Sequence, residues 1–190
     1  RKNNGEFDVI VPGGGGKDSS YVAYKLKHDY GMNPICVCAV PPLPTELGAT
    51  NLRNFAASGF NVLEITPNLK ISKEVARNAL IKHGQPQLDW LYAIFAVPLR
   101  ISTKLNIPFV MYGEEAESEY GGSKELEKKA DFNLDHIYNF YYSGIEITEL
   151  INSKYRSSDL EFLTLPSKDQ FKNVGIFPVH WSYFERWDEE

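Results

Sequence analysis

Hydrophobic residues along the chain form short continuous runs that are separated by longer stretches of helical spacing. The short runs lack alternating polar residues, which is typical of strands that are covered on both faces. Four of them span residues 7–11, 33–40, 61–65 and 107–113, and a fifth candidate spans 176–181. Strands and helices therefore alternate, which predicts an α/β layered sandwich with a parallel sheet and right-handed crossovers.

The stretches between these runs carry apolar residues at the spacing of amphipathic helices. We expect helices over Asp18–Tyr30, over 46–58 after an N-cap at Thr45, over about 71–82, and over Leu88–Leu105. From about residue 121 to residue 172 the chain is more polar, and we expect this C-terminal part to be mainly helical. Its tyrosine-rich stretch HIYNFYYSG favours packing over a binding platform, with both interpretations open.

Length and charge limit the class of protein. A chain of 190 residues is long enough for one core, so we expect one domain over 1–190, truncated at both ends because it opens with RKNNGEFD and stops at WDEE. A net charge of -5 argues against a nucleic-acid partner. No apolar run approaches the roughly 20 residues of a membrane span, and we expect no membrane association.

The two cysteines, Cys36 and Cys38, lie two residues apart in a predicted strand. Two cysteines make no disulfide framework, which favours a cytoplasmic protein. Neither a Cys-x-x-Cys motif nor a second ligand pair accompanies them. We interpret them as small apolar residues of a buried strand and assign them no function.

A glycine-rich loop, Gly13–Gly16, follows the first strand and leads directly into the first helix. In open α/β sheets, ligands bind beyond the carboxyl ends of the strands. Backbone N–H groups at a helix N-terminus bind anions, and glycines let the ligand approach the main chain. Lys17 adds a positive charge, and Ser19 and Ser20 add hydroxyl groups. The pattern predicts a phosphate site; a glycine-rich turn without a ligand is the alternative.

Two common phosphate loops do not fit this stretch. A Walker A loop ending at Gly16–Lys17 would need glycine at the position of Val11, and serine or threonine at the position of Asp18. A dinucleotide fingerprint that starts at Gly13 would also need glycine at Asp18. Both assignments are therefore excluded.

The stretch GGGKDS, Gly14–Ser19, resembles instead the Ser-Gly-Gly-x-Asp-Ser loop of the PP-loop ATP pyrophosphatases, with Gly14 in place of the serine. Further along, TELGATNLRNF, ITPN and FAVPLRISTKLNIPFVMYGEEAESEYGG follow in the order found in N-acetyl sugar amidotransferases of bacterial surface-polysaccharide biosynthesis. The resemblance covers nearly the whole chain and implies the adenine-nucleotide alpha-hydrolase type of α/β fold. It is the YGE and SEYGG pieces that indicate the narrower family.

The resemblance implies an AMP- and pyrophosphate-forming amidotransferase that uses ATP and Mg²⁺. Such an enzyme converts an N-acetyl group of a nucleotide-linked diacetamido sugar into an acetamidino group for lipopolysaccharide or O-antigen synthesis. A separate glutaminase subunit is expected to supply ammonia, because this chain carries no glutaminase nucleophile. The resemblance leaves room for a homo-oligomer.

Site residues follow from the same resemblance. Gly14, Gly15, Gly16 and Ser19 would hold the pyrophosphate portion of ATP, and Lys17 would neutralise its charge unless it points into solvent. Asp18 would either interact with the helix dipole or organise the loop and its metal.

The remaining assignments lie at the ends of the second and fourth strands. Ala39 and Val40 would meet adenine, and Gly113 would lie beside the same site. Glu114 is the further catalytic candidate. The candidate substrate residues are Glu119, Tyr120 and Gly121, whereas Glu117 is as easily part of a solvated acidic loop.

Two departures from the family pattern bear on these expectations. Gly14 lacks the hydroxyl donor of the motif serine, and HGQPQLDWLYAIF lacks the cysteines that family members carry before the long helix. A structural zinc is therefore not expected. The alternatives are another PP-loop enzyme (NAD synthetase-like or tRNA-thiolating), a nucleotide-binding module without turnover, and a scaffold subunit that has lost ATP.

Overall fold

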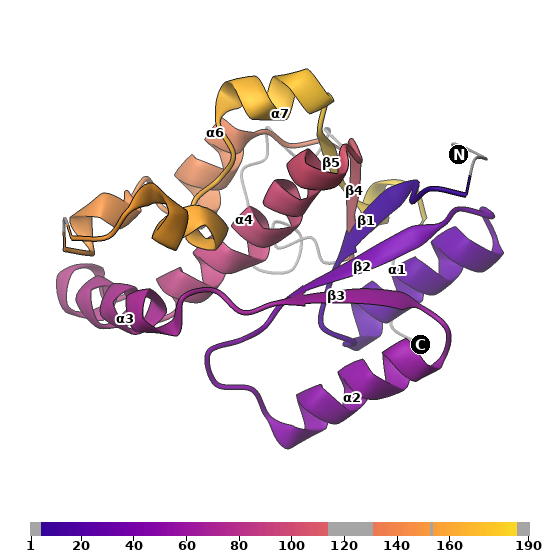
Figure 1. Cartoon of the computed structure of the whole chain (residues 1–190), viewed down its shortest axis with the longest axis horizontal. Helices are drawn as coiled ribbons and strands as arrows, with labels where there is room; N and C mark the ends of the chain where they lie inside the picture. The colour runs from indigo at the N-terminus through magenta and orange to yellow at the C-terminus, as the bar shows by residue number, and fades with distance from the viewer. Residues whose placement is uncertain (1–4, 114–130, 153, 186–190) are drawn as a thin grey trace.

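A computed structural model gives the fold, and the structure describes residues 5–113, 131–152 and 154–185 (Figure 1). Its elements, in chain order, are β1 Val9–Pro12, α1 Lys17–His28, β2 Pro34–Ala39, α2 Glu46–Ala57, β3 Asn61–Ile65, α3 Leu69–His83, α4 Leu88–Leu105, β4 Phe109–Tyr112, α6 Leu134–His136, the π-helix η1 Ile137–Tyr141, the 3₁₀-helices η2 Ile147–Glu149 and η3 Ser157–Leu163, α7 Lys168–Val174, β5 Phe177–His180 and the 3₁₀-helix η4 Trp181–Tyr183.

The five strands form one sheet in the order β3-β2-β1-β4-β5, and every pair of neighbouring strands is parallel. The chain first builds outward from β1 to β3 and then crosses to β4 on the other side of β1. The direction of winding therefore reverses between β1 and β4, which is where ligands bind in open α/β sheets. The predicted fold class, an α/β layered protein with a parallel sheet, is confirmed.

Helices cover both faces of this sheet (Figure 1). On one face, α1 and α2 pack over a cluster that includes Val11, Val22 and Cys36, with Phe55 at its margin. On the other face, α3, α4 and the C-terminal segments share the larger cluster. The strands are apolar on both sides for this reason, and their sequence shows no alternation. Of the helices in the described ranges, none is long and apolar enough to cross a membrane.

Local capping sets the helix starts. The Thr45 side chain accepts a hydrogen bond from the Gly48 N–H at 3.0 Å, which confirms the predicted N-cap. Asn68 caps α3 by accepting from Lys70 and Ile71, so this helix begins two residues before the predicted start at Ile71. From residue 131 to residue 172, the described part consists of short helical turns that bury apolar residues such as Ile137 and Leu150.

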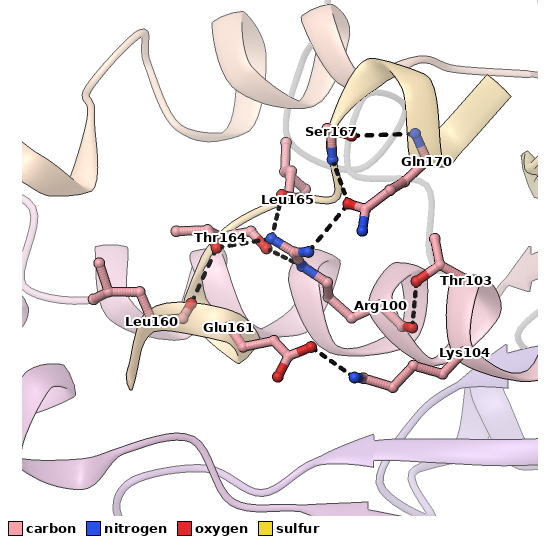
Figure 2. A network of polar contacts seen from close by, with 9 residues as sticks. All are labelled: Arg100, Thr103, Lys104, Leu160, Glu161, Thr164, Leu165, Ser167 and Gln170. Carbon is pink, nitrogen blue, oxygen red and sulfur yellow. Dashed lines mark hydrogen bonds and ion pairs between the residues drawn. The ribbon is translucent and has the colours of Figure 1, made fainter. Parts of the chain in front are cut away.

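Arg100 joins α4 to the segment that leads into α7, as Figure 2 shows. Its Nε donates to the Thr164 carbonyl at 3.0 Å, and its Nη2 donates to the Leu165 carbonyl at 2.9 Å and to the Thr164 hydroxyl at 3.1 Å. Nη1 reaches Gln170 Oε1 at 3.3 Å. Burial lowers the pKa of this guanidinium from its ordinary value. One side chain therefore links α4 both to the end of η3 and to α7.

We expect Arg100→Met to lower the free energy of unfolding by about 2–3 kcal/mol, because half-buried carbonyl groups lose a charged donor. The matched control is Lys104→Met, one turn along α4. Lys104 Nζ lies 2.7 Å from a carboxylate oxygen of Glu161, but both side chains are largely solvated, with exposures of 48% and 35%. Such a pair contributes about 0–1 kcal/mol. Urea unfolding of the two variants measures the difference, and equal losses would contradict the role given to Arg100.

Candidate functional site

The candidate site is the loop between β1 and α1. The Gly13 N–H still donates to the Val37 carbonyl of β2 at 3.0 Å, so the sheet extends to the first glycine. Gly16 is the N-cap of α1, with φ -70° and ψ 170°, and the Ser20 N–H donates to its carbonyl at 3.1 Å. Only residues 14 and 15 therefore separate the end of the sheet from the start of the helix.

Backbone amides are available in this loop. The N–H groups of residues 14–16, 18 and 19 make no backbone–backbone hydrogen bond to any residue that the structure describes. The first amides of a helix have no intrahelical partner, and the helix dipole places a partial positive charge beside them. The loop thus presents several donors at the carboxyl end of β1, which is an arrangement that binds phosphate.

Two of the four glycines are required by their surroundings. Gly15 has φ +79°, and a Cβ added there would lie 2.9 Å from the backbone of Leu52 in α2. A Cβ on Gly13 would lie 2.1 Å from the Cβ of Ser19. Helix α2 therefore packs against the loop at Gly15, and helix α1 packs against it at Gly13. The alternative of a glycine-rich connecting turn explains Gly13 and Gly15, but it does not explain the other two.

Gly14 and Gly16 are not confined by the protein. Among the residues that the structure describes, a Cβ on Gly16 would meet nothing within 4 Å, and one on Gly14 would meet only the Cys38 sulfur, at 3.5 Å. Both positions are exposed. Bare backbone on the open side of the loop is what a ligand needs to approach the amides closely.

Asp18 brings a carboxylate to the same end of α1. Its Oδ1 is buried and accepts no hydrogen bond in the part of the chain that the structure describes. The Lys17 Nζ lies 4.0 Å from this oxygen, and its own side chain is 70% exposed. A Cβ on Gly113, directly after β4, would lie 3.0 Å from the carbonyl carbon of Asp18. The structure therefore brings together Gly113 and Asp18, which are distant in the chain.

The donor set at Asp18 fits Mg²⁺. This ion prefers oxygen ligands, keeps several waters, and is usually held by one or two carboxylates together with substrate phosphates. The buried Asp18 carboxylate oxygen accepts no hydrogen bond from the described residues and lies beside the amides of the glycine loop, which meets that description. Among the described residues, no group of three or more His, Cys, Asp or Glu side chains could hold a metal. Asp18 would hold such an ion together with the phosphates of a bound nucleotide.

The structure places three other predicted residues. Ser19 lies against Gly13, and its hydroxyl donates to the Gly16 carbonyl over a long 3.5 Å. Ala39 ends β2 and is buried. The Val40 N–H donates to the Ile65 carbonyl at 2.8 Å, so this amide is not available to a ligand. The Val40 carbonyl accepts no backbone hydrogen bond from the described residues.

Five predicted residues lie outside the described residues: Glu114, Glu117, Glu119, Tyr120 and Gly121. The assignment of Glu114 as a catalytic group, and of Glu119, Tyr120 and Gly121 as substrate-binding groups, stays a prediction, as does the alternative of a solvated acidic loop for Glu117.

The cysteines lie in β2, below the loop. Burial raises the pKa of the Cys38 thiol to about 11 and that of Cys36 to about 12. Both are free thiols, protonated at neutral pH, and a protonated buried thiol is a poor nucleophile. Their interpretation as apolar residues of a buried strand is consistent with this environment.

Two contacts of the loop could not be found from the sequence. The Leu52 backbone limits Gly15, and the Cys38 sulfur lies under Gly14. The period-2 spacing of Cys36 and Cys38 placed them on one face of a strand, but no sequence signal told which face lies under the glycines.

The space at Gly14 leads to a prediction for Gly14→Ser. The added Cβ makes ordinary contact with Cys38, and the hydroxyl gives the loop a further phosphate donor. We expect about tenfold tighter ATP binding, on the order of 1.5 kcal/mol, measured by titration calorimetry. Gly14→Ala adds the same Cβ without the hydroxyl and should give no gain. Equal affinities of the serine and alanine variants would contradict a phosphate at this position.

Comparisons with known proteins give limited information. No protein-family model matches the chain, and no curated protein matches it. Among solved structures, a chain described as a "predicted subunit of tRNA methyltransferase" from Methanocaldococcus jannaschii is similar, with a TM-score of 0.46 and 20% sequence identity. The match covers 90% of this chain and 74% of that chain. A likeness at this level does not establish function. The geometry of the loop therefore carries the functional argument.

Proposed function

We propose that this chain is a PP-loop ATP pyrophosphatase of the adenine-nucleotide alpha-hydrolase type, and that it activates an amide by adenylation. The observation that carries the proposal is the loop itself. It combines amides at the end of β1 that make no backbone–backbone hydrogen bond to any described residue, the exposed glycines Gly14 and Gly16, and a buried Asp18 oxygen that accepts no hydrogen bond from the described residues. Together these features suit a polyphosphate with its cation.

The narrower proposal is an N-acetyl sugar amidotransferase. Its support is the order of the sequence pieces around the loop, and above all YGE after β4. The acceptor would be a nucleotide-linked diacetamido sugar, and ammonia would come from a glutaminase subunit. Lipopolysaccharide synthesis in the cytoplasm is the corresponding setting.

The chemistry follows from the substrate. The amide carbonyl oxygen attacks the α-phosphorus of ATP, and the bond from that phosphorus to the bridging oxygen breaks to release pyrophosphate. Ammonia then adds to the activated carbon, loses protons to solvent, and expels AMP with the former carbonyl oxygen. The product is an amidine. Neither step needs a covalent enzyme intermediate, so positioning and charge stabilisation account for the protein's contribution.

Different residues at the loop would bind different parts of ATP and its metal ion. The amides of Gly14, Gly15 and Gly16 would bind the pyrophosphate portion, and Lys17, whose side chain is largely exposed, would neutralise its charge. Asp18 would hold Mg²⁺, which offsets triphosphate charge that one lysine cannot offset. Glu114 would follow as a further catalytic group.

A product assay tests the proposal. The protein would be incubated with ATP, Mg²⁺, ammonium and a panel of UDP-linked diacetamido sugars, and the nucleotides would be separated by chromatography. AMP and pyrophosphate that form only with one sugar are the expected result, and EDTA should abolish them. ADP as the product would contradict the proposal, because it would mean cleavage at the γ-phosphate.

A nucleotide-binding module without turnover is the second candidate. The observation that favours it is Gly14, since the loop lacks the hydroxyl of the motif serine although the site has room for one. The second function would be established if the wild type binds ATP but forms no AMP with any of the sugars. Gly14→Ser should then restore AMP formation.

A further inference from the structure

Two side-chain rings lie at the ends of the neighbouring strands β4 and β5, which follow β1 in the sheet on the edge opposite β2 and β3. Tyr112 is the last residue of β4 and His180 the last of β5, and the two are register partners. Their ring centroids lie 6.0 Å apart, and both residues are buried, at 9% and 6% exposure. Register partners point to the same face of a sheet. That face is the one covered by α4, because Tyr112 packs on Phe95 at 5.6 Å.

Further aromatic residues extend this pair into a cluster. Phe132 stacks on His180 at 4.6 Å and lies 5.4 Å from Tyr112. His136 lies 6.2 Å from Phe132, and Tyr141 lies 5.7 Å from His136. We call Tyr112, Phe132, His136, Tyr141 and His180 the ring cluster. Tyr112, Phe132 and His180 are buried, whereas His136 and Tyr141 are half-buried and form the outer side of the cluster.

The backbone beside the ring cluster is irregular. Residues Ile137–Tyr141 form a π-helix, and Ser143 follows with φ 54°, a left-handed conformation that is uncommon for a residue other than glycine. Single π-turns and left-handed non-glycine residues recur at functional sites. The same stretch contains the tyrosine-rich run whose role the sequence leaves open.

The Tyr112 hydroxyl is buried and has no hydrogen-bond partner among the residues that the structure describes. A buried polar group without a partner destabilises the folded state, and in native proteins it calls for an explanation such as a ligand. Burial raises the pKa of Tyr112 well above its ordinary value, with a further contribution from Tyr141. The phenol therefore stays protonated and can donate a hydrogen bond at neutral pH.

We propose that the ring cluster is the acceptor subsite, and that it binds a neutral ring-shaped ligand bearing hydroxyl and amide groups, such as an N-acetylated sugar. This inference rests on the proposed function, which it deepens by naming the residues that recognise the acceptor. The cluster contains no Lys or Arg, so it is not suited to an anion. Aromatic faces pack against the C–H faces of a sugar, and the Tyr112 hydroxyl donates to a carbonyl or hydroxyl oxygen.

The location of the cluster suits this role. Tyr112 directly precedes Gly113, and Gly113 lies against Asp18 in the first turn of α1, directly after the glycine loop. The cluster is therefore on the β4–β5 side of the point where the winding of the sheet reverses, and the loop is on the β1 side. A nucleotide on the loop and an acceptor on the ring cluster would meet across this point.

Tyr112→Phe tests the inference, because it removes only the unpartnered oxygen. We would measure, by titration calorimetry, the affinities of wild type and variant for ATP, for a UDP-linked diacetamido sugar, and for UDP alone. The expected result is about tenfold weaker binding of the UDP-sugar, with the affinities for ATP and UDP unchanged. The midpoint of thermal unfolding should stay equal or rise, since a buried unsatisfied group is lost.

Tyr142→Phe is the matched control. The Tyr142 hydroxyl is also buried but donates to the Tyr92 carbonyl at 3.2 Å. Its removal should lower the unfolding midpoint and leave sugar affinity unchanged. Unchanged UDP-sugar affinity in Tyr112→Phe, or a wild type that binds the UDP-sugar no better than UDP, would overturn the subsite. Failure of the wild type to bind ATP would instead overturn the proposed function, so the two failures are distinguishable.

Discussion

Replacing Asp18 by asparagine is expected to lower the rate of AMP formation by a factor on the order of a hundred or more, which is the usual effect of removing one charge-stabilising group from an active site. The reason is the loss of a carboxylate next to the loop whose buried oxygen accepts no hydrogen bond from the described residues. The change keeps the size of the side chain. The free energy of unfolding should therefore change by about 1 kcal/mol or less. Rates are measured by chromatography at saturating Mg²⁺.

Asp29→Asn is the control for Asp18→Asn. Asp29 follows the other end of α1, is 47% exposed and pairs with Lys25, so its charge is solvated and far from the loop. This variant should make AMP at the wild-type rate. If Asp18→Asn also retains that rate, Asp18 does not hold the cation, and its carboxylate interacts only with the helix dipole.

Gly15→Ala is expected to weaken ATP binding by a factor on the order of ten or more, equivalent to about 1.4 kcal/mol. Two physical causes act together. The left-handed φ of +79° is unfavourable for alanine, and the new methyl group would lie 2.9 Å from the Leu52 backbone, which cannot rotate away as a side chain could. Strain and overpacking together should lower the free energy of unfolding by about 2–4 kcal/mol.

Gly16→Ala distinguishes an effect on ATP binding from an effect on the free energy of unfolding. Here φ is -70° and the added methyl group meets nothing within 4 Å, so the protein should lose about 1 kcal/mol or less, as expected at an N-cap. Its methyl group would nevertheless occupy the open side of the loop, and ATP should bind more weakly. Thermal unfolding and calorimetry on the two variants check both statements. Normal ATP binding by both would contradict a phosphate on this loop.

The sequence predicted the parts of the site that are contiguous along the chain. The apolar runs gave the strands, and the glycines between a strand and a helix indicated an anion site, because both depend on local composition and spacing. The N-cap at Thr45 was predicted for the same reason. Helix α3 begins two residues before the predicted start, because the Asn68 side chain accepts hydrogen bonds from the Lys70 and Ile71 N–H groups and caps the helix there.

The tertiary structure decided what depends on strand order and register. Only the sheet order places Gly113 against Asp18 and pairs Tyr112 with His180, because these residues are distant in the chain. The packing of α2 likewise distinguishes Gly15, which has no room for a side chain, from Gly16, which has. Spacing along one strand determines which residues share a face, but the neighbour across that face is determined by the rest of the fold. The sequence alone therefore determined the fold class and the loop, and the structure determined which of its residues are confined by packing and which remain open to a ligand.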